Sequence, residues 1–287
     1  MALSNNKSSA ERTGNRIKIG VIGCGALSHE LAANLDKVLP GKFQFAGFLA
    51  RTASKAEAMA SEYGGEAFTD IEAMLAVKPD YIVEMAGVPA VKAYGQRVLQ
   101  AGISLIVVSI GALADKALLA ELEQTALANN SKMYVVNGAV GGFDVLQTIA
   151  LMNQAKGWQY KKAEIENIKA PGSINGAPYL EGRELSETEE ELVFTGNVQE
   201  AIAGFPKNVN VAVSSSLAAE ADNYEVIIKS VPGLTENKHI IRVDNGMVRA
   251  EIGIYSQPDP ANPKSSTSTA WSVIALLKNL VAPVVYY

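Results

Sequence analysis

The chain has 287 residues, of which 48% are hydrophobic and 19% charged, and its formal net charge is −5. Domains usually span about 100–200 residues, so this length predicts about two domains, and the composition is that of a globular protein. The mildly acidic balance offers no basic surface to a polyanion, which argues against nucleic acid as a partner.

The cysteine and histidine counts further limit the kinds of site that the protein can contain. The lone Cys24 excludes an internal disulfide, and with only His29 and His239 as histidines no metal site is predicted. Residues 1–15 are polar, lack the apolar core of a signal peptide and are expected to form a disordered tail. No run approaches the roughly 18 consecutive apolar residues of a membrane span, so we expect a cytoplasmic protein without a membrane partner.

Residues 16–142 alternate short apolar runs with helical patterns. Strands are predicted at 17–22, 43–49, 81–84, 104–109 and 133–136, and helices at 29–35, 54–63, 88–101 and 116–129. Strands separated by helices of about 10–15 residues predict an α/β fold with right-handed crossovers and a doubly wound parallel sheet, the Rossmann arrangement. In such a sheet a ligand lies beyond the carboxyl ends of the strands, where this chain has small residues such as Gly23, Gly25 and Ala86.

The turn after the first strand, residues 23–28, reads G-x-G-x-x-S. Gly23 permits a tight turn, and Gly25 lets the main chain approach a pyrophosphate, which then lies at the N-terminus of the next helix. The third position usually holds Gly or Ala, and Ser28 is small enough to replace them. We predict that Gly23, Cys24, Gly25, Ala26 and Leu27 bind a dinucleotide, with Cys24 as a packing residue. The alternative is an ordinary glycine turn.

The end of the second strand indicates which dinucleotide is preferred. NAD-specific domains usually have an acidic residue there for the ribose 2′-hydroxyl, but this chain has Arg51 and Thr52, which suit a 2′-phosphate. NADP(H) is therefore the predicted cofactor, with NAD(H) as second choice. The alternative is that Arg51 is a solvated loop cation.

Residues 143–287 follow a different pattern. We expect an α+β domain with a mostly antiparallel sheet that binds substrate and a second subunit. Its strands are predicted at 161–168, 224–230, 239–243 and 247–255, and its helices at 145–154, 194–203 and 209–219, with a loop at 170–191. The last helix, 268–280, is apolar on most sides and is expected to be buried against the cofactor domain or a dimer partner.

Five segments together resemble the L-aspartate dehydrogenase family: SIGALAD (109–115), GAVGGFD (138–144), FPKNVNVA (205–212), NKH (237–239) and NPKSS (262–266). The resemblance implies reductive amination of oxaloacetate, or oxidation of aspartate to iminosuccinate, with NAD(P) and in a homodimer. It also implies an active-site histidine at His239 and cofactor contacts at Ala139 and Asn210. The chain departs from the family pattern at Asn137, at residues 230–232 and at Gln199, which bears on the exact substrate more than on the reaction class.

The residues of the second half fit this chemistry. His239 is its only histidine, and an unperturbed pKa of about 6.5 suits a general acid or base near neutral pH. A buried structural histidine is the alternative. A dicarboxylate needs cationic or amide donors, for which the candidates are Lys169, Lys207, Asn208 and Asn237. For Lys207 the alternative is an ordinary surface lysine.

The predicted function is therefore that of an L-aspartate dehydrogenase or iminosuccinate reductase, whose partners are a small dicarboxylate and ammonia. One alternative is a related NADP-dependent reductase of another small oxo or imino acid. The other is a non-catalytic NADP(H)-binding redox sensor, which would need no proton carrier. A sugar dehydrogenase is disfavoured, because residues 84–87 lack the Lys-Pro that such enzymes commonly carry there.

Overall fold

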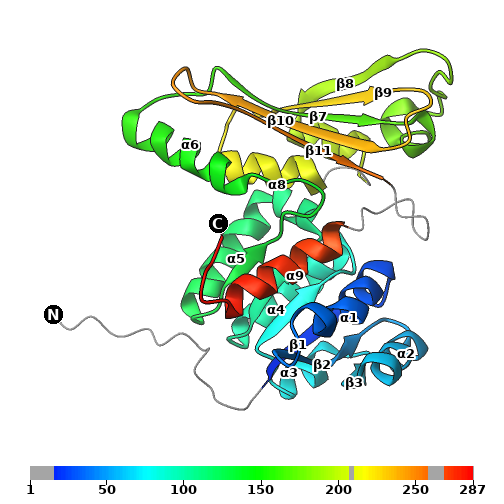
Figure 1. Cartoon of the computed structure of the whole chain (residues 1–287), viewed down its shortest axis with the longest axis vertical. Coiled ribbons are helices and arrows are strands. Elements are labelled where there is room, and N and C mark those ends of the chain that lie inside the picture. Colours follow the sequence, from blue (N-terminus) through cyan, green and yellow to red (C-terminus); the bar gives the residue numbers. More distant parts are fainter. Residues whose placement is uncertain (1–15, 207–209, 258–267, 287) are drawn as a thin grey trace.

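The computed structural model describes residues 16–206, 210–257 and 268–286 (Figure 1). In these ranges the first part of the chain forms a six-stranded sheet, and every pairing within it is parallel. Its order is β3 (Glu66–Phe68), β2 (Phe43–Leu49), β1 (Ile17–Ile22), β4 (Tyr81–Glu84), β5 (Ser104–Val107) and β6 (Met133–Val135). The strand order reverses between β1 and β4, so the predicted doubly wound sheet is confirmed. In sheets of this kind a ligand binds beyond the carboxyl ends of the two strands at the reversal.

Helices connect the strands of this sheet. They are α1 (Ala26–Val38), α2 (Ala53–Tyr63), α3 (Ile71–Ala76), α4 (Val88–Gln100), the 3-10 helix η2 (Ile110–Ala114) and α5 (Lys116–Ala128). β3 and α3 are absent from the predicted elements, because segments of three and six residues are too short to show a hydrophobic periodicity. One local signal for α3 was present in Asp70, whose carboxylate accepts the Ala73 N–H at 3.0 Å and caps the helix.

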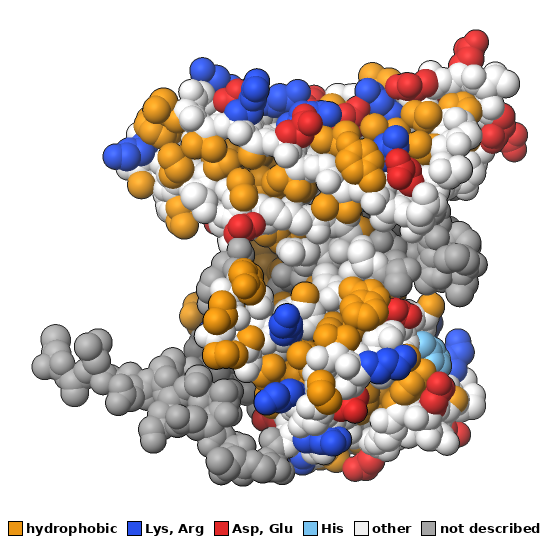
Figure 2. Space-filling view, viewed as in Figure 1, with side chains coloured by type: hydrophobic (Ala, Val, Ile, Leu, Met, Phe, Trp, Pro, Cys, Tyr) orange, Lys and Arg blue, Asp and Glu red, His pale blue; other side chains and the backbone are white. Residues whose placement is uncertain are grey.

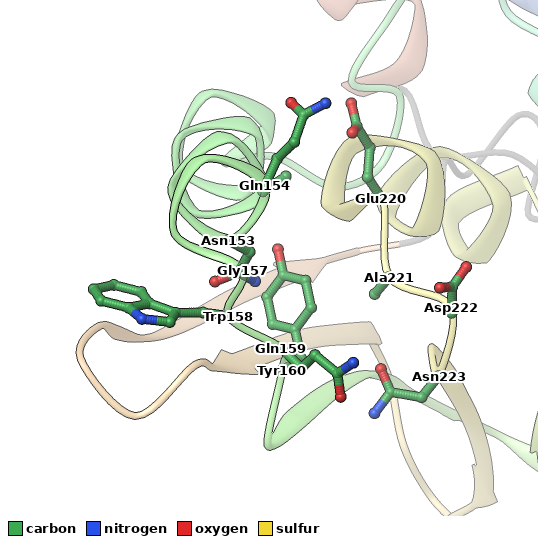
Figure 3. A pocket seen from close by; sticks show the side chains of 11 residues that line it. Asn153, Gln154, Gly157, Trp158, Gln159, Tyr160, Glu220, Ala221, Asp222 and Asn223 are labelled. Carbon is green, nitrogen blue, oxygen red and sulfur yellow. The ribbon is translucent and has the colours of Figure 1, made fainter.

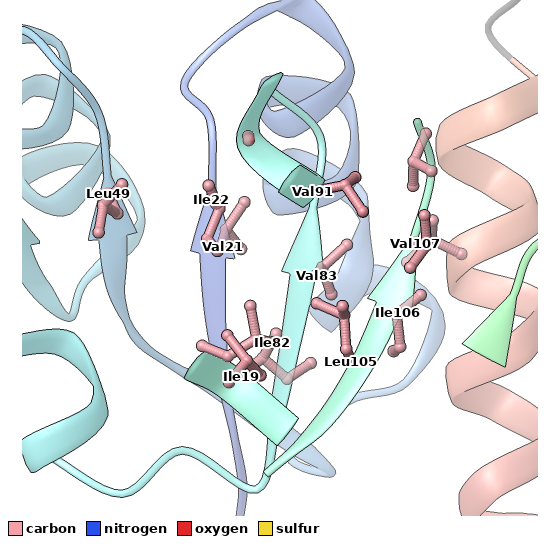
Figure 4. Close-up of a cluster of buried hydrophobic side chains, with 14 of the residues drawn as sticks. Ile19, Val21, Ile22, Leu49, Ile82, Val83, Val91, Leu105, Ile106 and Val107 are labelled. Carbon is pink, nitrogen blue, oxygen red and sulfur yellow. The ribbon is translucent and has the colours of Figure 1, made fainter. Parts of the chain in front are cut away.

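The core of the first sheet is formed by β-branched and other aliphatic side chains. Ile19, Ile82 and Ile106 are each fully buried on three neighbouring strands (Figure 4). Burial on both faces of a parallel sheet explains why these strands read as continuous apolar runs rather than alternating ones.

The second sheet has the order β11 (Arg249–Ser256), β10 (Asn237–Asp244), β7 (Lys162–Lys169), β9 (Glu225–Ser230) and β8 (Glu191–Asn197). Three pairings are antiparallel and β7 with β9 is parallel, so the sheet is mostly antiparallel, as expected. One face is covered by α6 (Phe143–Lys156), α7 (Val198–Gly204) and α8 (Asn210–Ala219), which lie between the two sheets in Figure 1.

The helix predicted at 194–203 is wrong over its first four residues. Residues 194–197 belong to β8, where pairing with β9 satisfies their main-chain groups. The helix begins only after Asn197, whose side chain accepts the Glu200 N–H at 2.9 Å while the Glu200 carboxylate accepts the Asn197 N–H. This capping box was readable in the sequence and marks the boundary.

The last helix, α9 (Ser268–Val281), returns to the first part of the chain. Val273, Ile274 and Leu277 are buried in the core of the first sheet, and Trp271 donates a hydrogen bond of 3.0 Å to Glu30 of α1. Burial of this stripe explains why α9 is apolar although it has only 14 residues. Within the described ranges, no helix is both long and apolar enough to cross a membrane.

Candidate functional site

The turn after β1 has the geometry that a dinucleotide needs. Gly23 has φ +107°, and a Cβ there would lie 2.7 Å from the Met85 carbonyl oxygen, so only glycine fits without strain. Gly25 begins α1, and no atom lies within 4 Å of the place a Cβ would take, which leaves room beside the N-terminus of α1. Ser28 is fully buried, 3.8 Å from the Met85 sulfur, so this position requires a small side chain. The residues present therefore fit a bound pyrophosphate.

The other predicted loop residues lie around this turn. Ala26 and Leu27 are the first two residues of α1. Cys24 is half-buried with its Sγ 4.0 Å from the Leu49 carbonyl oxygen. Burial raises the pKa of the Cys24 thiol, an effect that the Lys55 ammonium partly offsets. The thiol therefore stays protonated, as expected for a packing residue.

Arg51 and Thr52 are exposed just beyond the carboxyl end of β2, which pairs with β1. Thr52 precedes α2 and makes no side-chain capping bond, so its hydroxyl is available to a ligand. Lys55 lies one turn into α2, four residues after Arg51. Lys55 is not among the residues predicted from the sequence; because Arg51 precedes the helix, the two cations do not form a helical pair.

A buried carboxylate connects the loops that follow β4 and β5. Glu84 is 1% exposed, and it accepts the N–H groups of Ala86 at 2.7 Å and Gly87 at 2.9 Å. It also accepts the Ser109 N–H at 3.1 Å and the Ser109 hydroxyl at 3.0 Å. Burial raises the pKa of Glu84. Glu84 is not among the site residues predicted from the sequence. The available signal was an acidic residue at the end of an otherwise apolar strand.

Two connections between the sheets contain residues that the resemblance singled out. Asn210, the first residue of α8, accepts the Gly111 N–H through Oδ1 at 2.8 Å. Ala139 is half-buried in the loop after β6, where the Gly138 N–H donates to the Ser272 hydroxyl at 3.1 Å. Side chains of α8 and α9 thus hold loops of the first sheet in place.

The covered face of the second sheet is polar at one end and apolar at the other. His239 on β10 pairs with Asn167 on β7, and in the next row Asn237 pairs with Ser256 on β11. In the other direction along β10, Ile241 lies opposite Ile165 of β7 and Val243 lies opposite Ala163, so this part of the face is apolar. A charged group could therefore be accommodated at the polar end of this face but not at the apolar end.

His239 is 5% exposed, and its Nδ1 lies 2.6 Å from Oδ1 of Asn167. Burial, together with the Lys169 ammonium, lowers the pKa of His239 to about 3. The expectation of a histidine that titrates near neutral pH is therefore not met, because the sequence carries no measure of this burial. His239 is a neutral imidazole at physiological pH.

Lys169 is the last residue of β7 and is half-buried, and desolvation lowers its pKa to about 8. It pairs with Ser230 of β9, which is fully buried. In the described part of the chain the hydroxyls of Ser230 and Ser256 have no hydrogen-bond partner. Lys207, Asn208 and the segment 262–266 lie outside the described residues.

The structure therefore brings His239, Lys169 and Asn237 together with Asn167, which the sequence analysis missed. Asn167 precedes Lys169 by two residues in a strand, a spacing that places both on one face and was the available signal. A cavity of about 540 Å³ lies elsewhere, between the ends of α6 and α8, and contains none of the predicted site residues (Figure 3). Among the described residues no three His, Cys, Asp or Glu side chains lie close enough to hold a metal ion.

The chain matches two family models: "Aspartate dehydrogenase, C-terminal" over residues 150–280 and "Homoserine dehydrogenase, NAD binding domain" over residues 23–136. It is 33% identical over 277 residues to an L-aspartate dehydrogenase of Methanosarcina barkeri, covering 93% of this chain and 98% of the relative. It is also 33% identical over 266 residues to one of Acinetobacter baumannii, covering 92% and 97%.

Solved structures agree with the fold. The crystal structure of aspartate dehydrogenase from Thermotoga maritima superposes with a TM-score of 0.72 at 24% identity, covering 95% of this chain and 100% of that one. An archaeal homoserine dehydrogenase in complex with NADPH gives a TM-score of 0.56 at 14% identity, covering 92% and 97%.

Proposed function

The chain belongs to the L-aspartate dehydrogenase family, and from that premise we propose how its residues interconvert L-aspartate and iminosuccinate. It is an oxidoreductase acting on a CH–NH2 group with a nicotinamide cofactor. The observation that carries the proposal is the polar end of the second sheet, where His239, Asn167 and Lys169 are gathered on one face. The hydrogen bond from Gly111 to Asn210 connects the two parts beside the cofactor loops.

We propose that residues 16–142 bind the cofactor and residues 143–287 the substrate, with α9 packed back on the first part. The contacts to the cofactor would come from Gly23, Cys24, Gly25, Ala26, Leu27, Arg51, Thr52, Ala86, Ala139 and Asn210. When bound, the nicotinamide supplies or accepts the hydride. The open space beside Gly25 and the loops fixed by Glu84 support this assignment.

In the substrate half, Lys169 and Asn237 would bind substrate carboxylates, with Lys207 and Asn208 remaining predictions from the sequence alone. A substrate carboxylate beside Lys169 would favour the charged ammonium, which desolvation disfavours. His239 is neutral and would accept a proton from the water that adds to the imine, or return it when ammonia enters.

Purified protein should oxidise NADPH when given oxaloacetate plus ammonia, and reduce NADP when given L-aspartate. A panel of other 2-oxo acids with ammonia serves as the control for substrate identity. Turnover of another acid but not of oxaloacetate would favour a related reductase. NADPH binding without turnover of any acid would favour a redox sensor.

We further propose that NADP(H) is preferred over NAD(H). Arg51→Ser should raise KM for NADPH roughly 10–100-fold, since a charge-assisted hydrogen bond is worth about 1.5–3 kcal/mol, and should leave KM for NADH nearly unchanged. The matched control is Arg16→Ser, because Arg16 is equally exposed but lies at the opposite, amino end of β1. Equal changes in both KM values would contradict the preference.

We also propose a homodimer in the cytoplasm. In Figure 1 helices lie on only one side of the second sheet, and the other side carries a charged cluster, part of which gathers along the top of Figure 2. Arg242 bonds Glu164 at 3.1 Å, Glu166 at 2.8 Å and Glu251 at 2.7 Å, while the exposed Tyr255 lies on the same face. A second copy seated on this face would cover the cluster, and sedimentation of the full chain should give twice its mass.

A further inference from the structure

A short polar contact at the proposed substrate site joins two side chains on adjacent strands. His239 and Asn167 are register partners of β10 and β7, and their Nδ1 and Oδ1 atoms are 2.6 Å apart. Both residues are buried, with exposed fractions of 5% and 2%. Water therefore competes little for this hydrogen bond, and the strand pairing fixes the positions of both Cα atoms.

The chemistry of the two groups determines where the imidazole proton lies. An amide oxygen accepts hydrogen bonds and never donates them, so a short contact with Oδ1 requires a proton on Nδ1. A neutral imidazole carries one N–H, so Nε2 then has a free lone pair. No described residue places a hydrogen-bond partner on Nε2.

The alternative arrangement is chemically distinct. If the Asn167 amide were rotated by half a turn, its NH2 group would donate to a bare Nδ1, and the proton would move to Nε2. The ring would then present a donor to the substrate instead of an acceptor. An aspartate at position 167 would differ again, because a carboxylate beside Nδ1 stabilises the charged imidazolium.

We infer that Asn167 is a positioning residue that fixes His239 as the Nδ1–H tautomer, so that Nε2 accepts a hydrogen bond from the substrate. The acceptor suits an amine N–H or the O–H of an attacking water, and it does not suit a carbonyl oxygen. The identity of the substrate rests on the proposed function, whereas the tautomer does not.

The tautomer is directly measurable in this chain, because its only other histidine is His29. In a His29→Gln protein with 15N-labelled histidine, NMR should show a protonated Nδ1 and a bare Nε2 from pH 6 to 8 without substrate. Asn167→Ala should give a mixture of tautomers. Asn167→Asp, which keeps the side-chain shape, should give an imidazolium that persists to higher pH.

Kinetic measurements provide a second test of the positioning role. Asn167→Ala should lower kcat roughly 10–100-fold with a smaller change in KM, since positioning acts on the chemical step. Asn167→Asp should acquire an acidic limb in its pH profile that the parent lacks, which a merely structural role would not produce. If Asn167→Ala fails to fold, the isosteric aspartate variant decides alone.

A proton on Nε2 in the parent protein would overturn the inference, as would an unchanged tautomer and an unchanged pH profile in both variants. An Nδ1–H tautomer in a protein that does not turn over aspartate would leave the inference standing and reject the proposed function instead.

Discussion

His239→Ala should lower kcat/KM for L-aspartate by roughly 10²–10⁴, the usual contribution of a positioned general acid or base. In the proposed mechanism the neutral ring at the polar end of the second sheet would accept the proton of the attacking water, and alanine offers no acceptor. The dissociation constant for NADPH should stay within about twofold, because none of the proposed cofactor contacts lies on β10, the strand that carries His239. Steady-state kinetics and fluorescence titration measure the two quantities.

His29→Ala is the matched control, because it removes the other histidine, which is exposed on α1. Its kcat/KM should resemble that of the parent protein. The proposed role would be rejected if His239→Ala kept full kcat/KM. A loss confined to thermal stability would instead indicate a buried structural histidine.

The larger features of the fold could be predicted from the sequence because they depend on local patterns. Apolar runs between helices gave the doubly wound sheet, and alternation gave most strands of the second sheet. The failures were of two kinds. Elements of three to six residues, such as β3, are too short to show a hydrophobic periodicity. At Phe194, pairing with a strand that is distant in the sequence overrides a helical pattern.

The site was predictable in part for the same reason. His239 and the glycine turn stand in motifs, so their placement followed from short stretches of sequence. The environment of His239 could not be predicted in this way. Its neutral state depends on Asn167 and Lys169, which lie about 70 positions earlier and meet it only through the pairing of β7 and β10. The sequence contains these residues, but only the register of the sheet brings them together.

Replacement of Lys169 is also expected to have a large effect on activity. Lys169→Met should lower kcat/KM for L-aspartate roughly 10²–10³-fold, since removing one partner of a buried charge pair costs about 2–5 kcal/mol. The pKa of Lys169 is lowered to about 8, so the ammonium that would bind a carboxylate is lost above that pH. Inhibition by succinate, whose carboxylates do not titrate there, should weaken about tenfold per pH unit above roughly pH 8.

Two further measurements separate binding from structure at Lys169. Lys169→Arg keeps its charge at all accessible pH values, so the weakening above pH 8 should disappear from its succinate profile. Folding lowers the Lys169 pKa from 10.5 to about 8, so the folded state binds fewer protons between these two pH values. The desolvation of the ammonium therefore reduces the free energy of unfolding, and this reduction is fully present below pH 8. Lys169→Met removes this desolvation cost together with the interactions of the ammonium, so its Tm at pH 7 measures the balance between the two, at about 2–4 °C for each kcal/mol, while its activity should fall. A succinate profile that stays flat in the parent protein would contradict a carboxylate-binding role for the Lys169 ammonium.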